Sequence, residues 1–176
     1  RTVLPYLRKV DLTFDRMLFF ERDVSNMELK LEPVDVQDIV DAVLQQTPET
    51  EMVRVDHQQK STKRAPRVLG DDVRLTFCIE SVLSYLLRVA PQDSRVEVTL
   101  KPTGSKLVVG MFVPGMPEPA MAQEGEQQSG WLGDAWSELA SGLDTVQKLV
   151  KRQQGKVLGP DCDQGGWGYR FELTIA

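Results

Sequence analysis

The clearest periodic pattern in the chain lies between Gly70 and Pro91. Apolar residues recur there at intervals of three and four positions: Leu75, Cys78, Ile79, Val82, Leu86 and Val89. This spacing is typical of the buried face of an α-helix. Asp71 or Asp72 can supply the oxygen that caps such a helix at its start. The pattern therefore predicts one long helix whose apolar stripe lies in a core.

The same stretch carries a second stripe that is neither apolar nor fully polar. It consists of Arg74, Ser81, Ser84, Tyr85 and Arg88. Residues at these spacings lie on one side of a helix. A mixed stripe of this kind indicates a helix that faces either a pocket or a partner.

Three other segments have helical spacing. Residues 2–25 predict an exposed amphipathic helix, and Pro5 lies close enough to its start to be tolerated. Residues 36–44 follow Asp35, which can cap a short helix. Residues 135–153 predict a helix that Gly155 would end.

Period-two alternation and β-branched residues predict seven strands. Two pairs of them read as hairpins, one around Thr103 and Gly104 and one around the turn at residues 159–167. Pro33 is expected to end the first strand. The strands are Met27–Glu32, Glu51–His57, Arg67–Leu69, Arg95–Lys101, Lys106–Val113, Lys156–Leu158 and Gly168–Ile175.

Residues 114–134 are rich in proline and glycine and have no apolar period. A segment of this composition and length is either disordered or a functional lid. The order of the remaining elements places helices beside strands that pair mostly antiparallel. This order predicts an α+β fold, a two-layer α/β sandwich preceded by an N-terminal amphipathic helix.

Charge and composition exclude several classes of function. The formal net charge is −5 and the pI is near 5.0, so no basic field is present to attract nucleic acid or an anionic membrane surface. No apolar run approaches the ~20 residues of a membrane-spanning helix. Two cysteines far apart, Cys78 and Cys162, favour a reducing compartment such as the cytoplasm, and with the single His57 they offer no metal-ligand spacing.

Four stretches, in this order, resemble the ATP-binding domain of sensor histidine kinases, the Bergerat-type fold shared with gyrase-type ATPases and Hsp90-like chaperones. The stretches are LKLEPVDVQDIVDAVL, GDDVRLTFCIESVLSYLLRVAP, KLVVGMFVPGMPEP, and SGLDTVQKLVKRQQGKVLGP with the closing GYRFELTIA. The resemblance implies that residues 27–176 form the ATPase-like domain. It also implies that residues 1–26 are the end of a dimerisation helix with its linker.

The resemblance assigns a nucleotide site whose residues this chain has largely replaced. In the family, the central helix presents an acidic or amide group, then an asparagine that ligates Mg²⁺, then a basic residue. These positions fall on Ser81, Tyr85 and Arg88, and only Arg88 matches. A phenol with a pKa of about 10 is a poor ligand for Mg²⁺, which prefers carboxylate, carbonyl and water oxygens.

The adenine-binding turn that the resemblance implies has also lost residues that the family uses to bind the nucleotide. The aspartate that accepts the adenine amino group in the family aligns with Val113, and a valine leaves that amino group unpaired at a cost of about 1 to 3 kcal/mol. Gly115 matches the first glycine of the turn. The second glycine falls on Pro117, which lacks an N–H donor.

The glycine-rich phosphate segment of the family aligns with residues 138–142, ELASG. Only Gly142 is kept, and Glu138 places a negative charge where phosphates would lie. Two tryptophans, Trp131 and Trp136, fall in or beside the lid segment. They can close an empty pocket against Tyr85 or anchor a partner.

Three altered motifs lead to one expectation, a degenerate histidine-kinase-type domain. We expect a pseudokinase module without ATP or Mg²⁺ and with no catalytic residue of its own. Its partners would be a response-regulator receiver or a neighbouring signalling domain, and a second copy bound through the N-terminal helix. Two alternatives stay open: a divergent active kinase that binds ATP through Arg88, Gly115 and Gly142, and a pocket for a different small ligand.

Overall fold

The structure is a computed structural model that describes residues 28–47, 53–56, 64–91, 93–117, 143–161 and 165–176. It contains a five-stranded sheet, a two-stranded sheet and helices, including the helical segment 143–152. The named elements are β1 (Glu32–Val34), α2 (Val36–Gln46), β2 (Val53–Asp56), β3 (Val68–Gly70), α3 (Asp72–Val89), β4 (Val96–Thr103), β5 (Lys106–Pro114), β6 (Lys156–Asp161) and β7 (Gly166–Thr174).

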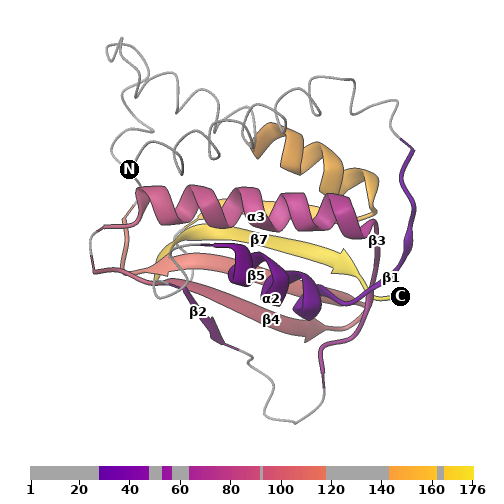
Figure 1. The fold of residues 1–176 in the computed structure, drawn as a ribbon, viewed down its shortest axis with the longest axis horizontal. Coiled ribbons are helices and arrows are strands. Elements are labelled where there is room, and N and C mark those ends of the chain that lie inside the picture. Colours follow the sequence, from indigo (N-terminus) through magenta and orange to yellow (C-terminus); the bar gives the residue numbers. More distant parts are fainter. Residues whose placement is uncertain (1–27, 48–52, 57–63, 92, 118–142, 162–164) are drawn as a thin grey trace, which may run out of the picture.

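The larger sheet has the strand order β2-β4-β5-β7-β6. All of its pairs are antiparallel except β2 with β4, which is parallel. Figure 1 shows α2, α3 and the helical segment 143–152 on one face of this sheet. The predicted α+β fold, a two-layer sandwich, is confirmed for the described residues.

The core lies between that face of the sheet and the helices. Alternate residues of the three central strands point into it, because successive side chains of a strand point to opposite faces. They are Val96, Val98 and Leu100 on β4, Leu107, Val109, Met111 and Val113 on β5, and Trp167, Tyr169, Phe171 and Leu173 on β7. Both hairpins that the sequence predicts, β4–β5 and β6–β7, are present.

Both predicted helix caps are present. The Asp35 carboxylate accepts hydrogen bonds from the backbone N–H groups of Gln37 and Asp38, at 3.0 and 3.3 Å. Of the two candidates for α3, Asp71 is the cap, and its carboxylate accepts from the Arg74 N–H at 3.1 Å. Arg64 forms an ion pair with Asp35 at 2.8 Å and another with Asp38, so the segment just before β3 is joined to the start of α2.

The first strand differs from the prediction of Met27–Glu32. Residues 28–31 are not in a strand, and β1 begins at Glu32 and contains Pro33. β1 pairs only with β3, as the edge of a two-stranded sheet, and an edge strand tolerates a residue without an N–H donor. The apolar alternation before Pro33 therefore did not mark a paired strand, and Leu31 is exposed.

The last helix also ends differently from the prediction. Gln154, not Gly155, has the left-handed conformation, with φ of 60°. Gly155 follows it and donates its N–H to the Val150 carbonyl at 3.0 Å. A Cβ at this glycine would lie 2.9 Å from the Glu172 carbonyl oxygen, so a close approach of backbone to backbone requires the glycine. The predicted N-terminal helix, and residues 135–142, lie outside the described residues.

The start of β7 depends on a second close approach. A Cβ at Gly168 would lie 2.1 Å from the Met111 carbonyl oxygen and 2.5 Å from the Phe112 Cα atom. Both are backbone atoms of β5, so they cannot move aside as a flexible side chain would. We expect Gly168→Ala to lower the free energy of unfolding by about 1 to 3 kcal/mol, measured by urea denaturation with circular dichroism.

Ser105→Ala in the exposed β4–β5 turn is the matched control, because it also introduces an alanine beside this sheet. It should change the free energy of unfolding by less than about 0.5 kcal/mol. Equal stabilities of the two variants would show that β5 and β7 are not so closely apposed.

Candidate functional site

The second stripe of α3 divides into three environments. Ser81 and Ser84 are half-buried, and Arg88 is exposed at the last turn of the helix. Tyr85 is only 7% exposed and belongs to the hydrophobic core. The stripe therefore does not form one continuous surface, because its largest side chain points into the sandwich.

Tyr85 packs against aromatic side chains of β7. Its ring meets that of Tyr169 edge to face, with the ring centroids 6.0 Å apart and the planes at 75°. Edge-to-face geometry is favourable between aromatic rings. Trp167 lies two residues before Tyr169 on the same face of β7 and is 4% exposed. We call Tyr85, Trp167 and Tyr169 the aromatic cluster.

The three side chains of the cluster are 4 to 7% exposed, and this burial affects their polar groups. Burial raises the pKa of the Tyr85 phenol, and the Trp167 side chain partly opposes that rise. Burial, together with the charge of Tyr85, also raises the pKa of Tyr169. The Trp167 Nε1 atom is buried and lies near the Tyr85 phenol. Among the described residues, it has no hydrogen-bond partner with ordinary geometry.

The turn after β5 lies next to the cluster. Val113 is fully buried and is paired with Trp167 across β5 and β7. Gly115 has φ of 71°, a conformation that favours glycine, and donates its N–H to the Gly165 carbonyl at 2.6 Å. Met116 follows and is 8% exposed. Buried core side chains, Tyr85 and Val113, therefore occupy the helix position and the strand position where the resemblance places polar nucleotide ligands.

The structure brings some of the sequence-predicted site residues together and leaves others outside its description. Tyr85 and Val113 belong to one buried cluster with Trp167, whereas Arg88 is exposed. Glu138 and Gly142, and with them Trp131 and Trp136, lie outside the described residues. Sequence reasoning missed Tyr169, although the alternation along β7 places it on the same face as Trp167 and Phe171.

Other chemistry finds little support in the described part of the chain. No three His, Cys, Asp or Glu side chains come together there as a metal site would require. The Cys78 thiol is fully buried, and burial raises its pKa, so it is not a reactive thiolate. None of the described helices is both long and apolar enough to cross a membrane.

Comparisons with known proteins identify the fold. Models of protein families give no match, and neither do curated protein sequences. Among solved structures, the Acinetobacter baumannii histidine kinase AdeS matches with a TM-score of 0.63 at 13% identity, over 98% of this chain and 80% of that one. Full-length ShkA in complex with AMPPNP matches at 0.62 and 20% identity, over 100% of this chain and 39% of that one.

The histidine kinase ThkA in complex with the response regulator protein TrrA gives a TM-score of 0.63 at 14% identity, over 99% of this chain and 49% of that one. The separate catalytic domain of ThkA gives 0.60 at 15% identity, over 85% of this chain and 97% of that one. The chain therefore has the fold of a histidine kinase catalytic domain, and the predicted resemblance is confirmed at the level of the fold.

The raised pKa values of the cluster predict a dependence of stability on alkaline pH. In the unfolded chain both phenols release their protons near pH 10, earlier than in the folded chain. Their stabilising contribution is therefore complete below about pH 10 and is lost as the pH rises above it. We expect the absorbance of tyrosinate to develop for Tyr85 and Tyr169 only as the chain unfolds.

Tyr169→Phe is the matched variant, because it keeps the ring and removes one titrating group. The free energy of unfolding of this variant should fall less steeply above pH 10 than that of the wild type. Ionisation of both phenols near pH 10 in the folded chain would contradict the burial of the cluster.

Proposed function

We propose that this chain is a degenerate histidine kinase domain that does not bind ATP productively and serves as a docking module in two-component signalling. The partner would be a response-regulator receiver or a neighbouring signalling domain. We propose the cytoplasm as its location. The observation that supports the proposal is the aromatic cluster, because it buries Tyr85, which the sequence resemblance aligns with the family's metal-binding asparagine.

Two physical arguments support the loss of nucleotide binding. First, a nucleotide at this position would have to move Tyr85 away from Tyr169 and Trp167. Re-exposing a large apolar side chain costs about 1.5 to 3 kcal/mol, and an aromatic pair adds about 0.5 to 1.5 kcal/mol. Second, the phenol would give Mg²⁺ no good ligand in return.

The strand side of the site adds a third argument. Val113 is fully buried against Trp167 and has no acceptor for an adenine amino group. A polar group buried there without a partner costs about 1 to 3 kcal/mol. These penalties come from separate elements, α3 and β5, so no single rearrangement removes both.

A response-regulator partner is supported by the likeness to ThkA, which was solved in complex with the response regulator protein TrrA. Docking of this kind needs a folded surface and does not need a bound nucleotide. A domain whose core is filled by its own side chains can present such a surface constantly. The proposed role is therefore binding and not phosphoryl transfer.

The alternative is a divergent kinase that still binds ATP. Gly115 favours it, because this residue matches the first glycine of the family's adenine-binding turn and has a φ of 71°. Exposed Arg88, and Gly142 outside the described residues, would then contact the phosphates. Full-length ShkA, of which 39% is similar in structure to this chain, was solved in complex with AMPPNP. Direct binding measurements separate the two candidates.

The first test is isothermal titration calorimetry of the full chain with ATP and Mg²⁺. We expect no binding heat up to millimolar nucleotide, whereas ShkA should bind in the same buffer as a positive control. Micromolar affinity of the wild-type chain would contradict the proposal. Arg88→Gln should then weaken binding more than Arg95→Gln, a control at a second exposed arginine.

Thermal unfolding gives an independent readout of the same question. A nucleotide present at one hundred times its dissociation constant would stabilise the fold by about 2.7 kcal/mol. We therefore expect an unchanged unfolding temperature on addition of ATP and Mg²⁺. An increase that Arg88→Gln removes would favour the active kinase.

The proposed homodimer can be tested by light scattering after size-exclusion chromatography. We propose that the apolar residues between 2 and 25 bind a second copy, so the full chain should have the mass of a dimer. Leu7→Asp places a charge on the apolar stripe and should give a monomer, whereas Lys9→Asp should leave the dimer intact. A wild-type monomer would contradict this part of the proposal.

A further inference from the structure

A chain of hydrogen bonds, buried at Asp71 and Gln153 and partly exposed at Lys30, joins three segments that are far apart in the sequence. At its centre is Asp71, which caps α3 and is 9% exposed. One carboxylate oxygen of Asp71 accepts from the Arg74 N–H at 3.1 Å, and the other accepts from the Lys30 N–H at 3.0 Å. Its own N–H donates to the side-chain oxygen of Gln153 at 2.7 Å.

Gln153 completes the chain at the end of the helical segment 143–152. It is 1% exposed, and its side-chain nitrogen donates to the Leu149 carbonyl at 3.1 Å. A fully buried amide in this position is held on both sides. The space around it is tight, because a Cβ at Gly70 would lie 3.1 Å from the Gln153 Oε1 atom and 2.5 Å from the Leu75 Cδ1 atom.

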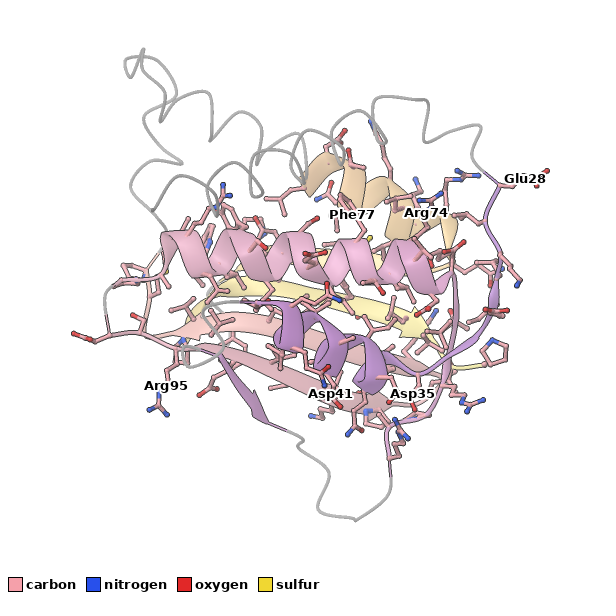
Figure 2. All side chains as sticks on the ribbon, in the orientation of Figure 1. Glu28, Asp35, Asp41, Arg74, Phe77 and Arg95 are labelled. Carbon is pink, nitrogen blue, oxygen red and sulfur yellow. The ribbon has the colours of Figure 1, made fainter. Side chains whose placement is uncertain are left out.

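The arrangement exceeds what helix capping requires. An N-cap needs one oxygen and the N–H of the second or third helical residue. Here the second oxygen holds the backbone just before β1, and the backbone N–H holds the C-terminal end of another helix. Figure 2 shows Glu28, where the described chain begins, at the end of the molecule near the start of α3.

We propose that the Lys30–Asp71–Gln153 chain couples the segment by which the polypeptide enters this domain to the C-terminal end of the helical segment 143–152. Breaking the buried bond between Asp71 and Gln153 leaves its donor and its acceptor unpaired, and the Asp71 carboxylate that accepts from Lys30 is then less well fixed. Local opening at Lys30 and at Gln153 is therefore linked. Because linkage is reciprocal, a change in the free energy of local opening at Lys30 changes that at Gln153, and the reverse also holds.

This coupling is independent of nucleotide binding. Through these hydrogen bonds, a displacement of the backbone before β1 would affect the first turn of α3 and the last helical turn before β6. A partner that moves the residues before β1 would in this way change the stability of the C-terminal end of the helical segment 143–152.

The test is amide hydrogen exchange resolved by nuclear magnetic resonance on the full chain. Gln153→Met keeps the length of the side chain and removes both of its hydrogen bonds. We expect the Lys30 amide, which donates to Asp71 and not to Gln153, to exchange about tenfold faster in this variant. Asp71→Asn should accelerate exchange both at Lys30 and at the amides of residues 153–155.

Asp72→Asn is the matched control, because it neutralises the adjacent but exposed acid in the same helical turn. It should leave exchange at both ends unchanged. If Gln153→Met unfolds the chain, Gln153→Asn, which is one methylene shorter, should give the same direction with about a threefold effect. Faster exchange confined to Asp71 and residues 149–155, with Lys30 unchanged, would reduce Gln153 to a local cap and overturn the proposal.

Discussion

The pairing of β5 with β7 is the constraint on which the rest of the structure depends. It runs without interruption from Lys106 and Thr174 to Pro114 and Gly166. This register fixes which β7 residues face the helices, since a shift by one residue would turn every side chain to the other face. It places Trp167 beside Val113 and brings Tyr169 beneath Tyr85. Because Gly168 has no Cβ atom, the two backbones can approach closely at that end.

The aromatic cluster is part of the hydrophobic core and is formed by side chains of the chain itself. In a nucleotide-binding domain, a polar cavity between helix and sheet is filled by the ligand and its metal. Here Tyr85, Trp167 and Tyr169 belong to the hydrophobic core, and under the proposed function they occupy the volume that a nucleotide would need. Under the same proposal, the burial that disfavours a nucleotide also stabilises the domain without one. A docking function is consistent with this arrangement, because a partner then meets a fold that is already formed.

The sequence predicted the layers, both hairpins and the helix caps because these depend on local periodicity and on short-range turn chemistry. Through the resemblance, the sequence also assigns Tyr85 and Val113 to the nucleotide site, and this assignment stays a prediction. It did not predict that Tyr169 completes the cluster, because a contact between α3 and β7 depends on the strand order and on register. The long-range bonds of Asp71 were also missed, since an aspartate at a helix start is fully explained by capping. The pairing of Pro33 was missed because its partner β3 is a strand of only three residues.

The short strand β3 carries contacts at both of its edges. β1 pairs with it along one edge, while Ile175 bridges to Val68 and the Ala176 N–H donates to the Arg67 carbonyl at 2.9 Å. Figure 1 shows β1, β3 and the C-terminus converging at one corner of the molecule. A pulling force applied between the first and last described residues would therefore load β3 before it reached the five-stranded sheet. Under tension, the contacts of β3 with β1 and with Ile175 would break first, and the five-stranded sheet would stay intact.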